Sequence, residues 1–400
     1  MRILMAVPHY PYPVVGGLER QAHELATALA QRGHVVHAVS SRFHAEQDRI
    51  ELIDGVRIHR TKWVMSRPGR FLLQPFSVAS TLVELRRDVD LVHVHCISSF
   101  GLFVTVVAKA LGLPVVSKLM NIGEFGVPGM RRRAFGWLRI AVLKKSDAII
   151  AMTPDSVAEL AGIGYPQAQV LRVPNGIRLL ETATGGGTPQ HYSSDSVTAI
   201  FVGRLFPQKG LTDLLRAWAT VKKRASCRVK LRIVGDGAQQ DELRALAAAL
   251  GLGDAVEFLG HRGDVPAELA KADLFVLPSY AEGNSNAILE AMRAGLAIVA
   301  TRVGGAPIQV GNQGDRWLVP PGDRQALADR LLELVEDAAI RHRLGAAMRA
   351  RVQTVFAIDE VAATYERAYE LILSGHCDRV GSLNPDLFSQ SDTKATSCAE

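Results

Sequence analysis

Short apolar runs alternate with amphipathic segments along most of the 400-residue chain. The first run, 3–7, is continuous, and it precedes a segment at 18–31 whose apolar residues recur at helical spacing. Gly33 follows and ends the predicted helix. Continuous apolar runs separated by helix-length segments are typical of parallel sheets covered by helices on both faces. Further strands of this first series are predicted at 35–39, 56–60, 91–95, 115–119, 148–152 and 170–173.

A second alternating series begins after a change in composition. Residues 181–196 are rich in Gly, Ser and Thr and contain few apolar residues, which is typical of a loop or linker. Beyond them, strands are predicted at 199–202, 231–234, 256–259, 274–277, 297–300 and 317–319. We therefore expect an α/β protein with two Rossmann-like, doubly wound parallel-sheet domains, at 1–175 and 176–356.

Three helices are predicted near the end of the chain, at 324–336, 338–354 and 359–373. The last carries a single apolar stripe, so it must pack on another surface. The stripe consists of Val361, Tyr365, Ala368, Tyr369 and Ile372. From Gly375 onward the chain is polar and lacks periodicity, and we expect residues 375–400 to be disordered.

The composition is that of a globular protein, with 48% hydrophobic and 22% charged residues. The net charge of +6 suits nucleic acid, an anionic membrane surface or phosphorylated small molecules, and it does not choose among them. The four cysteines lie far apart without a Cys-x-x-Cys pair, which favours a reducing, cytoplasmic compartment. The first apolar run is too short for a signal peptide. Because no run reaches the roughly 20 apolar residues of a membrane-spanning helix, membrane contact would be peripheral.

Two loops that follow predicted strands carry residues suited to a phosphorylated ligand. Gly16 and Gly17 precede the first helix, whose free N–H groups and positive dipole favour a phosphate. Arg204 and Lys209 follow the first strand of the second series, where Arg can bind a diphosphate bidentately and Lys adds a point charge. Taken singly, a Gly-Gly pair is more often a tight turn, and two loop cations are often simply solvated.

A third segment carries two carboxylates, Glu282 and Glu290, with seven residues between them. Glu282 precedes a turn in which Asn284 or Ser285 can cap a helix, and Glu290 lies inside that helix. Carboxylates accept hydrogen bonds from sugar hydroxyls, and the helix start adds N–H donors beside them. Two glutamates at this spacing also occur on many solvated helix faces.

Together and in this order, the three signals resemble the retaining glycosyltransferases of family 4, whose two Rossmann-like domains face a central cleft in the architecture called GT-B. The resemblance covers about residues 1–373. It rests on GGLE (16–19), DLVHVH (90–95), VPNG (173–176), GRLFPQKG (203–210), VGDG (234–237) and the E-x7-E segment (282–290). It implies transfer of a sugar from a UDP- or GDP-hexose to an acceptor hydroxyl with retention of configuration. Polysaccharide, glycolipid or other glycoconjugate biosynthesis is the implied setting.

The resemblance also implies roles for individual residues. The catalytic residues would be Glu282, near the donor sugar, and Arg204 and Lys209, which neutralise the diphosphate. Glu290 would hold the ribose. The remaining residues implied in donor binding are Gly16 and Gly17 at the diphosphate, Gly235, Asp236 and Gly237 along the nucleotide, and the backbone of Gly283, Asn284, Ser285 and Asn286 at the sugar.

The implied partners are a nucleotide-sugar donor and a sugar or lipid-linked acceptor, rather than nucleic acid. The first domain would bind the acceptor and the second the donor, and the helix at about 357–373 would cross back to the first domain. No Asp-x-Asp pair stands at a strand end in a metal-site context, so we expect no metal or other cofactor. Protein groups would then stabilise the leaving diphosphate.

One position departs from the family pattern. Many members have a histidine shortly after the fifth N-terminal strand, whereas Met120 stands at the best match here. His93 and His95 end the preceding strand, and we expect them in the core or the wall of the cleft. Three alternatives therefore stay open: a nucleotide-sugar epimerase, a phosphorylase of related fold, or a non-catalytic nucleotide-sugar-binding subunit.

Residues 130–145 combine six cations with apolar and aromatic side chains. At helical spacing, one apolar face is formed by Ala134, Trp137, Leu138, Ala141 and Val142, and much of the basic charge gathers at the two ends. One interpretation is peripheral contact with the cytoplasmic face of a membrane, where a lipid-linked acceptor would lie. In the other, the apolar face packs against the sheet of the first domain and the cations are solvated.

Overall fold

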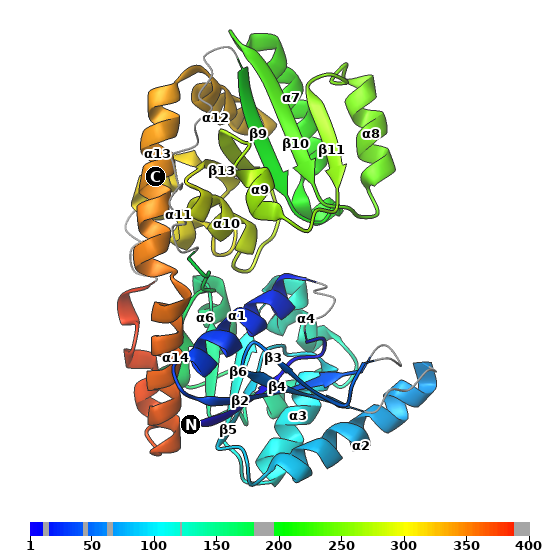
Figure 1. The fold of residues 1–400 in the computed structure, drawn as a ribbon, viewed down its shortest axis with the longest axis vertical. Coiled ribbons are helices and arrows are strands. Elements are labelled where there is room, and N and C mark those ends of the chain that lie inside the picture. Colours follow the sequence, from blue (N-terminus) through cyan, green and yellow to red (C-terminus); the bar gives the residue numbers. More distant parts are fainter. Residues whose placement is uncertain (11–15, 43–46, 62–66, 121, 180–195, 388–400) are drawn as a thin grey trace. The chain divides into compact units, whose positions relative to one another are not determined.

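The computed structural model describes residues 1–10, 16–42, 47–61, 67–120, 122–179 and 196–387. These residues form two α/β units, each with a sheet covered by helices (Figure 1). The first unit combines Met1–Arg178 with the segment that begins at Ile358, and the second comprises Leu179–Ala357. The divisions fall after 178 and 357, compared with the predicted 175 and 356. The α/β class with two doubly wound domains is thereby confirmed.

The sheet of the first unit has the strand order β3-β4-β2-β1-β5-β6-β7-β8, and every pair is parallel except β3 and β4. The order reverses beside β1, which lies between β2 and β5. Strands β5, β6 and β7 are buried along their whole length, as continuous apolar runs predict. The strands are β1 (Arg2–Ala6), β2 (Val35–Ser41), β3 (Ile50–Ile53), β4 (Val56–Thr61), β5 (Leu91–Val94), β6 (Val115–Leu119), β7 (Ala148–Ala151) and β8 (Val170–Arg172).

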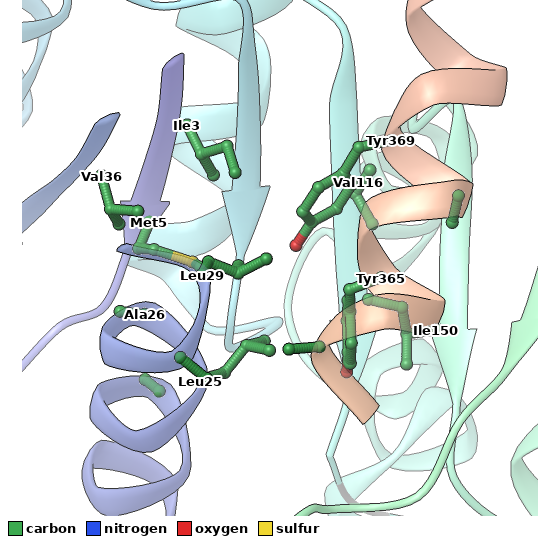
Figure 2. Close-up of a cluster of buried hydrophobic side chains, with 14 of the residues drawn as sticks. Ile3, Met5, Leu25, Ala26, Leu29, Val36, Val116, Ile150, Tyr365 and Tyr369 are labelled. Carbon is green, nitrogen blue, oxygen red and sulfur yellow. The ribbon is translucent and has the colours of Figure 1, made fainter. Parts of the chain in front are cut away.

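The helices of the first unit include the last long helix of the chain, α14, which packs beside α1 (Figure 1). The apolar stripe predicted for α14 is buried in the same core as α1 and the sheet. Figure 2 shows Tyr365 and Tyr369 of α14 beside Val116 and Ile150 of the sheet. The helices are α1 (Gly17–Gln31), α2 (Arg67–Leu85), α3 (Ser99–Ala110), η1 (Gly123–Phe125), α4 (Val127–Arg132), α5 (Gly136–Leu143), α6 (Pro154–Gly162), η2 (Gln167–Gln169), α14 (Ile358–Leu373), η5 (Cys377–Ser382) and η6 (Pro385–Leu387).

The second unit has a parallel sheet with the order β11-β10-β9-β12-β13-β14. Its order reverses beside β9. Trp218, Phe201 and Phe275 are fully buried around the sheet. The strands are β9 (Ser196–Val202), β10 (Arg228–Val234), β11 (Val256–Gly260), β12 (Leu274–Leu277), β13 (Ala297–Thr301) and β14 (Leu318–Val319). The helices are η3 (Pro207–Lys209), α7 (Leu211–Arg224), α8 (Gln240–Ala249), α9 (Val265–Leu269), α10 (Asn286–Ala294), α11 (Ala306–Gly314), η4 (Asp315–Trp317), α12 (Arg324–Glu336) and α13 (Ala338–Val355).

The segment after Gly375 differs from the prediction of disorder, which was wrong for residues 376–387. Within it, η5 packs against β8, η2 and α14. Val380 is completely buried in the core of the first unit, and Arg172 donates a hydrogen bond to the Gly381 carbonyl oxygen at 3.3 Å. Cys377 and Leu383 pack against the same core, so a few apolar contacts hold a stretch whose overall composition is polar. Residues 388–400 and most of the predicted linker, 180–195, lie outside the described residues.

The segment at 130–145 also differs, because it forms two helices, α4 and α5, rather than one. Phe135 between them has a left-handed backbone conformation, with φ of 57°. The expected apolar face does not pack against the sheet, since Trp137 and Leu138 are exposed. The packing expected in that interpretation was wrong, whereas its solvated cations agree with the exposed side chains at 131–133 and 144–145.

Candidate functional site

The candidate site of the second unit lies at the carboxyl ends of its parallel strands. In open α/β sheets, ligands bind outside these ends where the strand order reverses, which here is between β9 and β12. Arg204 and Lys209 follow β9, and Glu282 follows β12. The loop from Gly235 to Gly237 follows β10, the neighbour of β9. The fold thus brings the loops of three separate motifs to one edge of one sheet.

Lys209 and Glu282 connect two of these loops through an ion pair. Lys209 Nζ lies 2.5 Å from Glu282 Oε1, and Ser279 donates a hydrogen bond from Oγ to the same oxygen at 2.6 Å. The two side chains are 19% and 11% exposed, so the pair is partly shielded from water and still reaches the surface. An ammonium group has three N–H donors. Glu282 therefore holds Lys209 in position while other donors stay available for an anion.

Arg204 lies on the exposed part of the loop after β9, with its guanidinium 5.3 Å from the centre of the Phe206 ring. No carboxylate in the described part of the chain forms an ion pair with Arg204. Its planar N–H donors can therefore meet two oxygens of a phosphate at once.

The loop of Gly235, Asp236 and Gly237 packs against the backbone of the loop that carries Arg204. Leu205 N donates to the Asp236 carbonyl oxygen at 2.7 Å. Gly235 has φ of 129°, and a Cβ atom there would lie 1.9 Å from the Gly203 carbonyl oxygen. Only glycine allows this approach. The backbone of all three residues thus packs against the cation-bearing loop, while Asp236 as a whole is exposed.

The turn that carries Glu282 rests on a glycine pair that follows β13, Gly304 and Gly305. Gly305 N donates to the Gly283 carbonyl oxygen at 2.6 Å. A Cβ atom at Gly304, where φ is 52°, would lie 1.9 Å from the Glu282 carbonyl oxygen. No role was predicted for these glycines, although a Gly-Gly pair shortly after a buried strand is a signal for close backbone packing.

Gln309 of α11 holds the next part of this turn. It is completely buried, its Nε2 donates to the Ser285 carbonyl oxygen at 2.7 Å, and its Oε1 accepts from Ser285 N at 3.3 Å. It also lies 3.3 Å from Asn284 Oδ1. Ser285 caps α10 by accepting a hydrogen bond from Ile288 N. No local sequence pattern identified Gln309, because its partners lie more than 20 residues earlier.

Asn286 begins α10, and Glu290 lies one turn further along the helix with its side chain buried. The two carboxylates of the E-x7-E segment therefore occupy different parts of one strand–turn–helix unit. Glu282 is on the turn beside the cation loop, and Glu290 is in the helix. The predicted contact of Glu290 with a ribose remains a prediction.

Gly16 and Gly17 belong to the first unit, whereas the other predicted site residues belong to the second. Gly16 precedes α1 in an extended conformation, and Gly17 is its first residue. Among the described residues no side-chain cap hydrogen bond is made at Gly16, and the N-terminus of a helix generally favours an anion. Residues 11–15, directly before this turn, lie outside the described residues.

His93 and His95 of the first unit are buried in its core. His93 Nδ1 lies 2.6 Å from the Tyr369 hydroxyl, and the two imidazole rings stack with centroids 4.0 Å apart. Burial, with a further contribution from Lys118, lowers the pKa of both imidazoles well below the usual value. Both are therefore neutral core residues. Met120 directly follows β6 and is half-buried.

A surface pocket of about 580 Å³ in the first unit does not coincide with the predicted site. Its walls are α1 and the turn between β3 and β4, rather than the carboxyl ends of the sheet. It is lined by His23, Glu24, Thr27, Ala30, Gln31, His34, Asp54, Gly55 and Arg178. None of the predicted donor-binding residues lines this pocket.

Two α/β domains of this topology, with a cation loop after the first strand of the second domain and a carboxylate-bearing turn beside it, define a glycosyltransferase of the GT-B type. Residues 190–351 match the model of the glycosyl transferases group 1, and residues 16–176 match that of the glycosyl transferase 4-like domain. The chain belongs to glycosyltransferase family 4, as the motifs predicted.

Relatives and solved structures extend this likeness over nearly the whole chain. The D-inositol 3-phosphate glycosyltransferase of Arthrobacter sp. (strain FB24) is 30% identical over 91% of this chain and 92% of its own length. Sucrose-phosphate synthase from Thermosynechococcus elongatus has 22% identity and a TM-score of 0.75, covering 93% of this chain and 99% of that one. Anabaena HepE in complex with UDP-glucose has 21% identity and a TM-score of 0.72, covering 92% and 99%.

Proposed function

We propose that this glycosyltransferase moves a hexose from UDP-hexose or GDP-hexose to an acceptor hydroxyl with retention of configuration. The observation that carries the proposal is the Lys209–Glu282 pair at the reversal in strand order of the second unit. In this proposal, the ammonium group binds the diphosphate and the neighbouring carboxylate accepts hydrogen bonds from sugar hydroxyls. The UDP-glucose complex of the HepE protein, which has the same fold, supports a nucleotide-sugar donor.

The reaction needs charge stabilisation more than an enzyme nucleophile. As the bond between the anomeric carbon and the diphosphate oxygen breaks, its electron pair moves to the diphosphate, where Arg204 and Lys209 stabilise the new charge. The acceptor oxygen attacks the same face of the sugar, and its proton passes to a diphosphate oxygen. Glu282, fixed by Lys209 and Ser279, accepts hydrogen bonds from the sugar hydroxyls.

The acceptor that we propose is a saccharide or a lipid-linked saccharide, in the assembly of a polysaccharide or glycolipid at the cytoplasmic face of a membrane. The turn that begins at Gly283, held by Gln309, would lie at the donor sugar. The Ser285 N–H that was expected to meet this sugar instead donates to Gln309 Oε1, so it is not available to the donor. A buried glutamine that satisfies both backbone groups of Ser285 keeps this turn rigid. Rigid donors need no reorganisation when the transition state forms.

Proton NMR of the products formed from UDP- and GDP-hexoses, with and without saccharide acceptors, tests this proposal. We expect the nucleoside diphosphate together with a product whose new anomeric bond matches that of the donor. Arg204→Ala should lower turnover more than tenfold, because a charged hydrogen bond to phosphate is worth about 1.5–3 kcal/mol. Arg228→Ala, which removes another exposed arginine of the same unit, should leave turnover unchanged.

Four other outcomes would contradict the proposal, and each would indicate a different reaction or role for this protein. An inverted product would exclude retention. A new epimer that stays attached to the nucleotide would indicate an epimerase. Dependence on inorganic phosphate, with hexose 1-phosphate as a reactant or product, would indicate a phosphorylase. Donor binding without any turnover across the acceptor panel would indicate a non-catalytic subunit.

A further inference from the structure

The corner between α4 and α5 in the first unit has a fixed shape. Phe135 has left-handed backbone angles, and a Cβ atom at Gly136 would lie 2.2 Å from the Arg131 carbonyl oxygen. Arg139 donates from Nε to the Ala134 carbonyl oxygen at 3.3 Å, and from Nη1 to Ser99 Oγ at 3.4 Å. These contacts hold the corner to the start of α3.

The two helices bury one set of apolar side chains and leave another in solvent. Val127 and Met130 of α4 and Leu143 of α5 are buried in a core beside β6 and β7. Outside this core, Phe135 is 71% exposed, Trp137 73% and Leu138 46%. The other tryptophans in the described part of the chain, Trp218 and Trp317, are buried. Large aromatic side chains that stay exposed together mark a contact surface.

The exposed aromatic group lies between two clusters of positive charge. Arg131, Arg132 and Arg133 precede Phe135, and Lys144 and Lys145 directly follow α5. All five are exposed. Between residues 122 and 146 the sequence has six cations and one carboxylate, Glu124, which lies 3.5 Å from Arg132. Along the sequence, the exposed aromatic residues are therefore flanked by exposed cations on both sides.

We propose that this corner, residues 131–145, docks the enzyme on a membrane surface that contains anionic lipids. Tryptophan and phenylalanine rings favour the interface between lipid headgroups and acyl chains, and cations on either side meet the lipid phosphates. No helix in the described part of the chain is long and apolar enough to cross a membrane, so the contact would be at the surface. The proposal goes beyond the transfer reaction, and would bring the enzyme to a lipid-linked acceptor.

Co-sedimentation with vesicles tests this surface without any nucleotide sugar, so its failure would leave the proposed donor chemistry intact. Vesicles of phosphatidylcholine alone are compared, at low and high salt, with vesicles that also contain anionic phosphatidylglycerol as a minor component. The full-length protein is compared with the triple variant Arg131→Ser, Arg132→Ser and Arg133→Ser. A matched control, Lys223→Ser with Arg228→Ser and Arg343→Ser, removes the same charge from exposed positions of the second unit.

We expect wild type to bind the anionic vesicles at low salt, and to bind much more weakly at high salt or without anionic lipid. Each cation near an anionic surface contributes roughly fivefold to binding, so the Arg131–Arg133 variant should bind about 100-fold more weakly. The control triple variant should bind within a few fold of wild type. Because all these residues are exposed, melting temperatures should agree and exclude misfolding as the cause.

Tryptophan emission gives a second, independent measurement. Anionic vesicles should shift the emission of wild type to the blue, because Trp137 enters an apolar environment. The shift should be absent in Trp137→Phe, a variant that keeps an aromatic ring and still sediments with the vesicles.

Three results would overturn the proposal: no salt-sensitive binding to anionic vesicles, equal binding by the Arg131–Arg133 variant and its control, or a bound wild type whose emission does not move. Preference for an oligonucleotide over the vesicles, lost in the same triple variant, would assign the surface to nucleic acid instead.

Discussion

Lys118 of β6 is buried. The free-energy cost of burying its ammonium group can be measured through the pH dependence of stability. Its side chain is almost fully enclosed, with Nζ donating to Asn175 Oδ1 at 3.0 Å and lying 5.9 Å from the centre of the Tyr365 ring. No carboxylate of the described residues pairs with it. Burial lowers the pKa of this ammonium from 10.5 to about 7.

The direction in which Lys118 changes stability with pH follows from the protons bound by the folded and unfolded chains. Between pH 7 and 10.5 the unfolded chain keeps a proton on Lys118 that the folded chain releases, so stability rises with pH in this window. Below pH 7 both states are protonated, and the full penalty is present. At about 1.4 kcal/mol for each pKa unit, that penalty is roughly 5 kcal/mol. From pH 7 to 8.5 the lysine should add about 1.5 kcal/mol of stability.

Lys118→Met removes the titrating group and keeps an unbranched side chain of similar length. We expect its unfolding free energy to change by about 1.5 kcal/mol less than that of wild type between pH 7 and 8.5. Stability at a single pH is not decisive, because the variant also loses the hydrogen bond to Asn175. Lys145→Met, an exposed lysine of the same unit, should keep the wild-type slope.

Urea denaturation followed by circular dichroism measures this slope, and hydrogen exchange resolved by peptide assigns the transition of the first unit. The upper limit of pH 8.5 avoids the buried tyrosines, whose raised pKa values act in the opposite direction at higher pH. Parallel slopes for wild type and Lys118→Met would refute the reasoning. They would mean that Lys118 keeps an ordinary pKa inside the fold.

Three further predictions concern the site and the core. Lys209→Ala and Glu282→Ala should be coupled by about 1 kcal/mol or more in a double-mutant cycle on turnover, and additivity within about 0.5 kcal/mol would show that the pair does not act together. Gly304→Ala should destabilise the second unit by at least about 2 kcal/mol, whereas Gly263→Ala, where a Cβ atom meets nothing within 4 Å, should stay within about 0.5 kcal/mol. Tyr369→Phe, which loses its buried bond to the β5 histidine, should lower stability by about 1–2 kcal/mol in urea denaturation without changing donor binding; equal stability would contradict the hydrogen bond.

The parallel strands could be predicted from the sequence because both of their faces are buried, which leaves continuous apolar runs. Strand β3 was missed for the opposite reason. It lies at the edge of the sheet, pairs antiparallel with β4, and exposes Ile50 and Leu52 to solvent. An exposed edge strand carries little of the hydrophobic pattern on which the prediction depends.

In the candidate site too, residues within motifs could be predicted, whereas residues that depend on distant contacts could not. Motif order predicted Lys209 and Glu282 as site residues, and the structure shows their contact across 73 positions. The support from Gln309 could not be predicted, because nothing near it in sequence requires a buried amide. The helix break at Phe135 could not be predicted either. A phenylalanine with positive φ has no sequence signature, and the helical spacing of apolar residues continues through it.

Binding of nucleotide sugars to the free enzyme tests the central claim most directly. Thermal shift with a panel of UDP- and GDP-hexoses should reveal at least one that stabilises the folded chain by mass action, and calorimetry then gives its Kd. Lys209→Ala should weaken this binding at least tenfold, since a charged hydrogen bond to a diphosphate is lost. Lys222→Ala, which removes the similarly short Lys222–Asp254 ion pair of the same unit, should bind as wild type does. If no nucleotide sugar binds, or if Lys209→Ala binds as tightly as wild type, the assignment of this site is contradicted.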